Sequence, residues 1–382
     1  MVIKRVGVIG GGQLAWMMAG AAAKLGVELV VQTPSRDDPA VSIAAEVVLG
    51  AIDDATATAQ LAAQCNVITF ENEFVNLEAL SQLATQGVCF RPGLESLKPL
   101  LDKYHQRCYL QKLGLPTPQF AAWDNTWQQA LEEGAQNVPV SFPFVLKTRR
   151  HGYDGQGTFI IKDAQALNAA LGQLEDSQLL VEAFVPFERE LAAIAARSTT
   201  GEIVVYPIVE TQQEQQVCQR VFAPAKLSAA IAGDVEAIVQ TLLDRLQVVG
   251  VFGIEFFLTA DGKVLVNEIA PRTHNSGHFT LDACETSQFE QQLRSVCGLP
   301  LGSPAMQSPG AVMVNLLGYE QSQSDYQAKR QQLAAMPKSH LHWYGKKESR
   351  PGRKLGHITV LLEDAQQGEV IASTIEAIWY GS

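Results

Sequence analysis

Charged and imidazole side chains crowd one short stretch of the chain, residues 267–278, with the sequence NEIAPRTHNSGH. An apolar run before it predicts a strand that ends at Asn267 and Glu268. Arg272, His274 and His278 follow within a few residues. Functional groups concentrate where a rigid element gives way to a loop. We therefore expect this stretch to hold a ligand.

A second carboxylate is brought to Glu268 by the hairpin that residues 252–269, FGIEFFLTADGKVLVNEI, predict. Asp-Gly at 261–262 is a strong two-residue turn, and the register that follows places Glu255 opposite Glu268. Opposed side chains share one face of a sheet about 5 Å apart, where like charges repel. Either burial protonates one carboxyl or a cation lies between them. The apolar neighbours favour a divalent metal, Mg²⁺ or Mn²⁺, with Asn267 joining only if its strand bulges.

A glycine-rich loop lies between two predicted strands in residues 144–161, FVLKTRRHGYDGQGTFII. Lys147 ends the first strand, so the pattern is not a Walker A motif, in which the lysine opens a helix. Such a flap can offer backbone N–H groups to phosphates, and the lysine adds a positive charge. An ordinary long hairpin is the alternative. It does not explain why Lys147, Arg149 and Arg150 stand beside the glycines of an acidic protein.

Two glutamates follow in residues 179–190, LLVEAFVPFERE. The backbone near Glu182 to Val185 leaves a predicted strand and can present both a donor and an acceptor to an adenine edge. Glu190 can accept hydrogen bonds from two ribose hydroxyls. Taken singly, each glutamate is better explained as a surface charge.

The first glycine loop, GGGQLA at 10–15, matches the dinucleotide fingerprint between a strand and a helix. The acidic residue that should end the next strand is missing, because Gln32, Thr33 and Pro34 stand there. Arg36 could meet a 2′-phosphate, so an NADP-linked oxidoreductase remains open. A tight packing turn and a helix N-terminus that meets another anion are the alternatives.

Residues 338–354, KSHLHWYGKKESRPGRK, carry six Lys or Arg and one acid, a local charge of +5 in a chain whose net charge is −11. Gly and Pro interrupt the cluster. This favours a site for a small anionic molecule, best a phosphate, over a solvated basic patch. His274 and His278 have i,i+4 spacing, but Asn-Ser-Gly between them is a poor helix, so no zinc site is expected there.

The elements that position these groups suggest an α/β and an α+β region. Strands alternate with helices up to about residue 93, which predicts a parallel sheet covered on both faces. An alanine-rich helix up to about Leu25 and a short strand over 88–90 are among these elements. A periodic helix spans 98–113. Paired strands, one of them over 202–210, dominate from Phe142 and are interrupted by a helix over 234–246. A third unit begins after 298–304. The predicted domains are 1–97, 98–304 and 305–382, consistent with the length of 382 residues.

Composition excludes several classes of protein. The net charge of −11 argues against nucleic acid and anionic membranes as partners. No apolar stretch is long enough to span a bilayer, and the N-terminus does not resemble a signal peptide. Six scattered cysteines without a CxxC suggest neither disulfides nor zinc. We expect a cytoplasmic protein.

Taken in order, these motifs resemble the ATP-grasp ligases. GVIGGGQLA, KTRRHGYDGQG, VEAFVPFERE, GVFGIEFF, NEIAPRTHNSGH and RPGRKLGH are similar, more narrowly, to the N5-carboxyaminoimidazole ribonucleotide synthase family of purine biosynthesis. The resemblance covers essentially the whole chain. It implies an ATP-grasp fold with a Rossmann-like N-terminal (pre-ATP-grasp) domain and a small β-rich C-terminal domain. It also implies a homodimer.

The same resemblance implies a reaction and its participants. ATP phosphorylates bicarbonate to carboxyphosphate, and the exocyclic amine of 5-aminoimidazole ribonucleotide is carboxylated, leaving ADP and phosphate. An unstable acyl phosphate needs a closed, dry pocket and cations where charge accumulates.

Residue roles are implied by matching positions. For ATP these are Lys103, Lys147, the flap Gly152, Tyr153, Asp154, Gly155, Gln156, Gly157 and Thr158, the hinge Glu182, Ala183, Phe184 and Val185, then Glu190, Gln213, Asn267 and Glu268. For the metal they are Glu255 and Glu268. For the ribonucleotide they are Gly12, Gln13, Glu73, Tyr153, Asp154, Lys346, Arg353 and Lys354. The catalytic set is Asp154, Arg272, His274 and Lys354.

Three positions depart from the family pattern: Thr273 replaces a proline, Gln213 a histidine, and Lys103 an arginine. Each affects one contact. Other readings are a related ATP-grasp enzyme, such as a formate-using transformylase or a biotin-type carboxylase, the NADP-linked oxidoreductase, and a non-catalytic nucleotide-binding module. The RPGRKLGH motif and Asp154 favour the carboxylating ligase over the first, and the complete set of acids and lysines disfavours the last.

Overall fold

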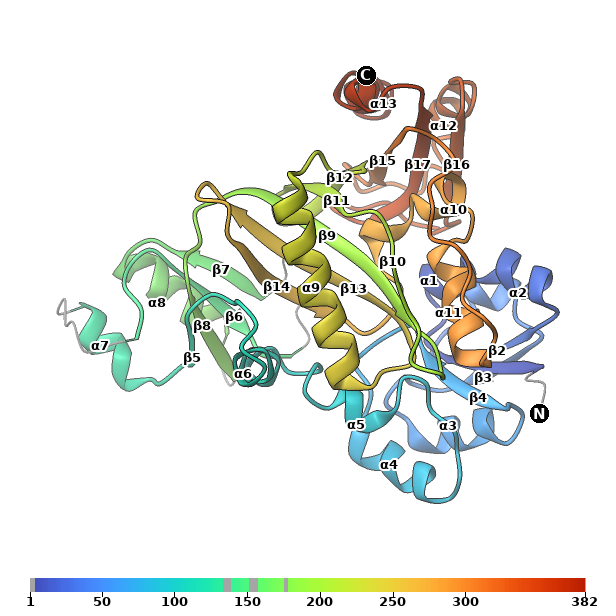
Figure 1. The fold of residues 1–382 in the computed structure, drawn as a ribbon, viewed down its shortest axis with the longest axis horizontal. Helices are drawn as coiled ribbons and strands as arrows, with labels where there is room; N and C mark the ends of the chain where they lie inside the picture. The colour runs from blue at the N-terminus through green and yellow to red at the C-terminus, as the bar shows by residue number, and fades with distance from the viewer. Residues whose placement is uncertain (1–3, 133–138, 151–156, 175–177, 382) are drawn as a thin grey trace.

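The computed structural model describes residues 4–132, 139–150, 157–174 and 178–381 (Figure 1). These residues form three sheets, one with nine strands and two with four strands each. The predicted combination of α/β and α+β regions is confirmed. Among the described helices, none is both long and apolar enough to cross a membrane.

The N-terminal unit is a parallel four-stranded sheet in the order β3-β2-β1-β4. Its strands are β1 (Arg5–Ile9), β2 (Glu28–Thr33), β3 (Glu46–Leu49) and β4 (Val67–Phe70). Its helices are α1 (Gln13–Trp16), α2 (Ala19–Leu25), α3 (Ala55–Ala62), α4 (Leu77–Thr85) and α5 (Leu94–Leu97), with the 3₁₀ turn η1 (Pro39–Ser42).

Two local predictions were wrong in this unit. The alanine-rich helix up to Leu25 is broken at Met17 and Met18, because both side chains are buried in the core and the Met18 N–H bonds the Ala15 carbonyl in a tight turn. The strand over 88–90 is only an isolated bridge of Phe90 to Ile68.

The small sheet, ordered β5-β8-β6-β7, carries the flap strands. Its strands are β5 (Phe120–Ala122), β6 (Phe144–Thr148), β7 (Thr158–Ile161) and β8 (Leu179–Ala183), with helices α6 (Lys103–Lys112), α7 (Thr126–Glu132) and α8 (Ala164–Gln173). Helix α6 begins five residues later than predicted, because the Asp102 carboxylate caps it by accepting from the N–H groups of Tyr104 and His105. Lys147 pairs with Thr158 across β6 and β7, as the predicted flap requires.

The nine-stranded sheet combines strands from the rest of the predicted central domain with strands from the predicted C-terminal domain. Along its main path the order is β14-β13-β9-β11-β12-β15-β17-β16, and β10 pairs with β9. The strands are β9 (Phe187–Arg197), β10 (Ile203–Val205), β11 (Val209–Glu214), β12 (Val217–Ala223), β13 (Gly250–Thr259), β14 (Val264–Ala270), β15 (Gly310–Leu317), β16 (Ser339–Trp343) and β17 (Lys354–Leu362). The helices are α9 (Ala229–Leu246), α10 (Thr280–Ala283), α11 (Gln288–Cys297), α12 (Gln327–Ala334) and α13 (Gly368–Tyr380), with 3₁₀ turns η2 (Asn275–Gly277) and η3 (Ala365–Gln367).

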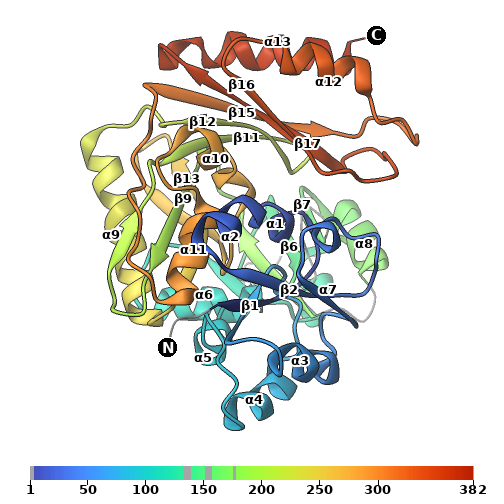
Figure 2. The ribbon, with the colours of Figure 1, turned by 90° about the vertical axis from the view of Figure 1, so that its right-hand side faces the viewer.

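Strand β12 pairs with β15, so the C-terminal strands extend the central sheet and do not form a sheet of their own (Figure 2). Helix α9 packs its apolar face on β9 and β13. Helix α11 contributes Phe289, Leu293 and Val296 to the core of the N-terminal unit, which fixes that unit against the central sheet. The predicted strand over 202–210 is two strands, because the chain leaves β10 before buried Tyr206 and re-enters at β11.

The β13–β14 hairpin differs from the prediction at its turn. The Thr259 N–H bonds the Lys263 carbonyl, so the loop has three residues, ending at Gly262 with φ +80°. This longer loop shifts the register by one residue. A bulge at Asn267 shifts it back, and Glu255 pairs with Glu268 as expected.

Candidate functional site

One cleft of about 1750 Å³ lies where the three sheets meet. The predicted site residues that line it are Gly12, Gln13, Glu73, Lys103, Lys147, Thr158, Glu182, Ala183, Phe184, Val185, Glu190, Gln213, Glu255, Asn267, Glu268, Arg272, His274, Lys346, Arg353 and Lys354. Gly157 is close in sequence but does not line the cleft. Gly152, Tyr153, Asp154, Gly155 and Gln156 lie outside the described residues.

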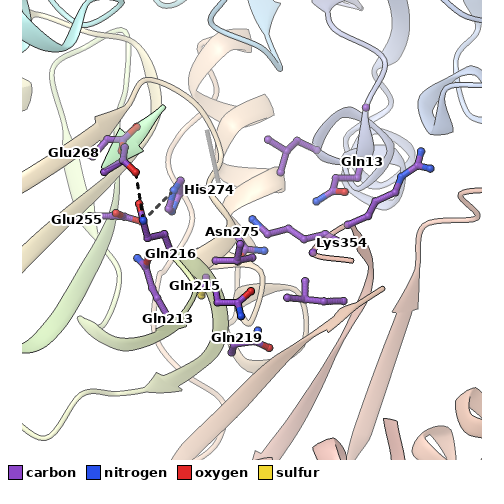
Figure 3. A pocket seen from close by; sticks show the side chains of 18 of the residues that line it. Gln13, Gln213, Gln215, Gln216, Gln219, Glu255, Glu268, His274, Asn275 and Lys354 are labelled. Atoms are coloured by element: carbon purple, nitrogen blue, oxygen red, sulfur yellow. Dashed lines mark hydrogen bonds and ion pairs between the residues drawn. The ribbon is translucent and has the colours of Figure 1, made fainter. Parts of the chain in front are cut away.

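The two carboxylates face the cleft from β13 and β14 (Figure 3). Burial raises the pKa of Glu255 to about 8, and the negative charges of Glu268 and Glu190 add to this. Enclosure in the cleft acts to raise the pKa of Glu268 as well, but Lys103 and Lys147 outweigh it and lower the value. The pair therefore holds one proton at neutral pH, as expected for like charges that share a site.

The bulge turns Asn267 toward this pair. Its Nδ2 donates to Glu255 Oε2 over 3.3 Å, and its Oδ1 lies 3.4 Å from Lys147 Nζ. The Lys103 ammonium lies 3.6 Å from Glu268 Oε2. Two carboxylates and a carboxamide oxygen are the hard oxygen donors that Mg²⁺ and Mn²⁺ prefer. The residues thus fit the predicted metal.

A buried ion cluster supports the flap side of the cleft. Glu182 Oε1 accepts from Arg107 Nε over 2.5 Å, and its Oε2 lies 2.7 Å from Lys147 Nζ. Burial would raise the pKa of Glu182, but the two cations lower it to about 2. Arg107 also donates to the carbonyl of the bulge residue Asn267 over 2.6 Å. The Glu182 side chain is therefore committed to this cluster, which leaves the backbone at 183–185 to serve as the predicted adenine hinge.

Glu190 lies on β9 in the same cleft, and burial raises its pKa to about 7, partly offset by Lys147. Nearby, the rings of Phe187 and Phe257 stack with centroids 4.7 Å apart and planes within 4°. Both rings line the cleft beside Val185. A flat apolar surface next to a polar backbone edge suits a nucleobase.

Arg272 and His274 lie next to the acid pair. Arg272 makes a two-pronged ion pair with Glu73, with Nε–Oε2 at 2.5 Å and Nη2–Oε1 at 3.0 Å. Burial lowers the pKa of His274 to about 4, with help from the charges of Arg272 and Lys354. His274 Nε2 stands 3.6 Å from Glu255 Oε1. The arginine thus stays charged, and the imidazole beside Glu255 stays neutral.

Gly253 on β13 permits this position of His274. A Cβ at residue 253 would stand 2.3 Å from the His274 Cβ and 2.6 Å from its Cγ. The backbone of His274 is held from the other side by Gln288, whose amide accepts from the His274 N–H and donates to its carbonyl.

The C-terminal basic segment reaches the cleft from the opposite side (Figure 3). Lys346 Nζ donates to Gln13 Oε1 over 2.8 Å and to the Lys354 carbonyl over 2.7 Å. Lys354 lowers the pKa of His274 and of Glu255, so its charge is felt at the acid pair. Arg353 donates to the Glu348 carbonyl within its own loop. The segment joins the first glycine loop to the catalytic stretch.

The first glycine loop is closed by a carboxylate of the protein itself. The N–H groups of Gly12 and Leu14 hydrogen-bond the Glu71 side chain, and burial raises the pKa of Glu71 to about 7. A Cβ at Gly12 would meet Glu71 Oε1 at 2.4 Å. Glu71 therefore occupies the position in which a dinucleotide pyrophosphate would accept hydrogen bonds from these N–H groups. This argues against the NADP-linked oxidoreductase.

Several residues that line or support the cleft were missed by the sequence reasoning. Arg107 lies inside the predicted helix α6, where only the rarity of a buried arginine could have flagged it. Gln215, Gln216 and Gln219 line the cleft beside Gln213. They follow no family motif used above, and only the QQEQQ run around the β11–β12 turn sets them apart.

Family models match three consecutive parts of the chain. They are the ribonucleotide synthetase preATP-grasp domain over residues 3–98, the ATP-grasp domain over 108–289, and the phosphoribosylaminoimidazole carboxylase C-terminal domain over 311–370. Together with the cleft between the sheets, they define an ATP-grasp enzyme with its preceding and following domains.

Relatives narrow this class. The chain is 55% identical to the N5-carboxyaminoimidazole ribonucleotide synthase of Synechococcus elongatus, over 99% of this chain and 96% of the relative. It is 37% identical to the Bacillus subtilis enzyme of that name, over 93% and 91%. Two crystal structures of the Aspergillus clavatus enzyme, one with ATP and one with ADP and 5-aminoimidazole ribonucleotide, superpose with TM-scores of 0.92 and 0.91 at 31% and 30% identity, each covering 99% of this chain and 98% of that chain. The chain belongs to the N5-carboxyaminoimidazole ribonucleotide synthase family.

Proposed function

We propose that this protein catalyses the ATP-dependent carboxylation of 5-aminoimidazole ribonucleotide in purine biosynthesis, and that the cleft residues described above perform it. The opposed pair Glu255 and Glu268 carries this proposal, because it shares one cleft with Arg272, His274 and Lys354. A ligase that forms an acyl phosphate needs carboxylates to bind a metal ion, a guanidinium to bind an anionic substrate, and further positive charge from a lysine.

ATP binds, in this proposal, between the small sheet and β9–β14. The backbone of residues 183–185 meets the adenine edge, and Glu190 accepts from the ribose hydroxyls. Lys103 and Lys147 attract the phosphates. Lys147 now faces Glu182 and Asn267, so it is already held in the cleft, and the flap at 152–158 adds its N–H groups from above.

Glu255 and Glu268, with Asn267 adjacent, would hold Mg²⁺ or Mn²⁺, which would supply charge neutralisation at the phosphates. Before binding, the shared proton limits repulsion between the two acids. With a cation between them both carboxylates would be ionised, and Glu255 would have released its proton to solvent.

Bicarbonate is positioned by Arg272 and His274. Glu73 holds the guanidinium with two hydrogen bonds, so its remaining donor edge is fixed in direction. A bicarbonate oxygen attacks the γ-phosphorus, the bond to ADP breaks, and carboxyphosphate forms. The neutral His274 ring can accept the bicarbonate proton, because its pKa lies near 4 in the free enzyme and the arriving negative charge raises it.

The ribonucleotide enters from the side of the first glycine loop and the basic segment. Lys346 and Arg353 attract its phosphate, while Gly12, Gln13 and Glu73 contact the sugar and ring. Tyr153, Asp154 and Lys354 face the amine. The amine nitrogen attacks the carbon of carboxyphosphate, or of the CO₂ released from it. The bond between that carbon and the phosphate oxygen breaks, and the departing phosphate takes the proton that the nitrogen loses.

The decisive assay measures phosphate release from ATP with Mg²⁺, with and without bicarbonate and 5-aminoimidazole ribonucleotide, together with the carboxylated product. We expect one ADP and one phosphate for each product. Product formed from formate, or phosphate release with no dependence on the ribonucleotide, would indicate a different ATP-grasp reaction. We further propose, on the resemblance alone, a homodimer acting in the cytoplasm. Light scattering on the purified chain tests the oligomeric state.

A further inference from the structure

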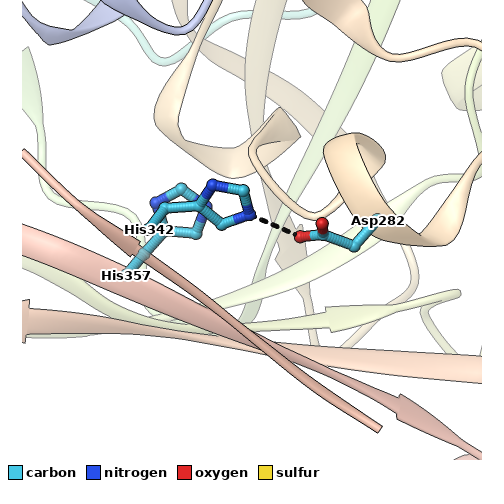
Figure 4. A group of neighbouring side chains, drawn as sticks. All are labelled: Asp282, His342 and His357. Carbon is cyan, nitrogen blue, oxygen red and sulfur yellow. Dashed lines mark hydrogen bonds and ion pairs between the residues drawn. The ribbon is translucent and has the colours of Figure 1, made fainter. Parts of the chain in front are cut away.

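Three side chains far apart in the sequence lie close together, and none of them is among the residues that line the cleft (Figure 4). They are Asp282 on α10, His342 on β16 and His357 on β17, and one ligand atom from each lies within 4.8 Å of the others. His342 Nε2 is 2.8 Å from Asp282 Oδ2. The imidazole rings of His342 and His357 stack with centroids 4.6 Å apart.

The Nε2 atom of His357 in this cluster has no hydrogen-bond partner among the described residues. Tyr344 Oη is 2.7 Å from His357 Nδ1 and occupies that nitrogen. His357 Nε2 is buried and finds no hydrogen-bond partner among the described residues, and the residue is 0% exposed. A buried polar atom left without a partner is destabilising, and such atoms in native proteins usually have a ligand or water to account for them.

The arrangement around His357 is that of a metal-binding histidine. Ligating histidines bond a metal through one ring nitrogen while the other is fixed by a neighbouring polar group. Here Tyr344 holds Nδ1, and Nε2 has no hydrogen-bond partner among the described residues, so its lone pair can serve a ligand. Two imidazoles and one carboxylate form a donor set typical of Zn²⁺ with an open fourth position. His340 Nδ1, 3.6 Å from Asp282 Oδ1, or a water can fill that position.

We propose that Asp282, His342 and His357 form a binding site for Zn²⁺ or a divalent transition metal of similar ligand preference, separate from the Mg²⁺ carboxylates. The nitrogen donors distinguish it from Glu255 and Glu268, since imidazole suits transition metals and all-oxygen sets suit Mg²⁺. This proposal does not depend on the carboxylation reaction.

Such a metal would fasten α10 to β16 and β17. Helix α10 directly follows the stretch that carries Arg272 and His274, and β17 begins at Lys354. The ion would therefore fix the two halves of the catalytic set relative to each other. Its role is structural, and none of its ligands is assigned to the substrates.

Co²⁺ is the probe, because it replaces Zn²⁺ and reports on coordination through its visible absorption. The full-length protein is titrated with Co²⁺ in excess Mg²⁺, which keeps the acid pair occupied. We expect one equivalent to bind with the intense absorption of low-coordinate Co²⁺ and to be displaced by Zn²⁺. Removal of one ligand in His342→Ala or Asp282→Asn should weaken Co²⁺ binding at least tenfold, and Tyr344→Phe about tenfold through His357.

Two variants serve as controls. His105→Ala removes an exposed imidazole on α6 and should leave the titration unchanged. Glu268→Gln should also leave it unchanged, which separates the two sites. Asp282→Asn keeps the size of the side chain, so it tests the ligand even where His342→Ala lowers stability. The absence of a Co²⁺ band in the folded protein, or equal Co²⁺ affinity in wild type and folded Asp282→Asn, would overturn the proposal.

Discussion

Gly253→Ala should disable the bicarbonate site without adding or removing a functional group. The new methyl carbon would stand 2.3 Å from the Cβ and 2.6 Å from the Cγ of His274. Carbon atoms make stable contacts at about 3.5–4.0 Å, so the His274 side chain must retreat by roughly 1 Å or more. The backbone of His274 cannot follow freely, because Gln288 holds both its N–H and its carbonyl.

A displacement of about 1 Å in a positioning group can lower the rate about 100-fold. We therefore expect kcat/KM for bicarbonate to fall by about that factor, while the dissociation constant of ATP changes little. The double variant Gly253→Ala/His274→Ala should be no slower than His274→Ala, because the methyl group acts through the ring it displaces.

Gly233→Ala is the matched control. Gly233 is exposed on α9, and a Cβ there meets nothing within 4 Å. We expect unchanged kinetics and a gain in stability of about 0.5–1 kcal/mol from the higher helix propensity of alanine. A folded Gly253→Ala protein with wild-type kcat/KM for bicarbonate would refute the role given to His274.

The other predictions concern the acids and cations of the cleft. Glu268→Gln should abolish turnover with the fold intact by circular dichroism, and wild-type rates would remove the metal assignment. Because the pKa of Glu255 is raised to about 8, the metal-free acid is protonated below that pH, so the apparent Mg²⁺ affinity should fall by up to about tenfold for each pH unit below 8. Calorimetry in buffers of different ionisation enthalpy should detect the released proton, and a pH-independent affinity would contradict it. Repulsion rises as that proton is lost, so Glu255→Gln should raise Tm of the metal-free protein at pH 8.5 by on the order of 2 °C, measured by scanning calorimetry. Lys354→Ala should lose carboxylation while some ATP hydrolysis survives, and unchanged product formation would exclude its role. Arg107→Ala should lower the free energy of unfolding by about 3 kcal/mol in urea titrations, since it leaves a buried carboxylate with one partner fewer.

The acid pair could be predicted from the sequence because a local signal sets it. An Asp-Gly turn fixes a hairpin, and its register determines which side chains face each other. The prediction succeeded although one premise was wrong, because the extra residue in the loop is balanced by the bulge at Asn267. No residue in the hairpin announces that bulge. It is held from outside by Arg107, which comes from a helix about 160 positions earlier.

The continuity of the large sheet could not be predicted in the same way. Pairing between β12 and β15 joins residues about 90 positions apart, and strand patterns state which residues are apolar but not which strands are neighbours. For the same reason the ion pair between Arg272 and Glu73 could not be predicted from the sequence. Glu73 follows the last strand of the parallel sheet, and only the packing of α11 on that sheet brings it to the cleft.

Because one sheet carries Glu255, Glu268 and Lys354, these residues cannot move independently of one another. The strands that carry Glu255 and Glu268 and the strand that begins at Lys354 belong to one hydrogen-bonded sheet, so neither can move far against the other without breaking strand pairs. A movement that changes the distance between Lys147 and these strands would then involve the small sheet of β5 to β8. A protein cut before β15 would also leave β12 with an open edge, ready to pair with another chain.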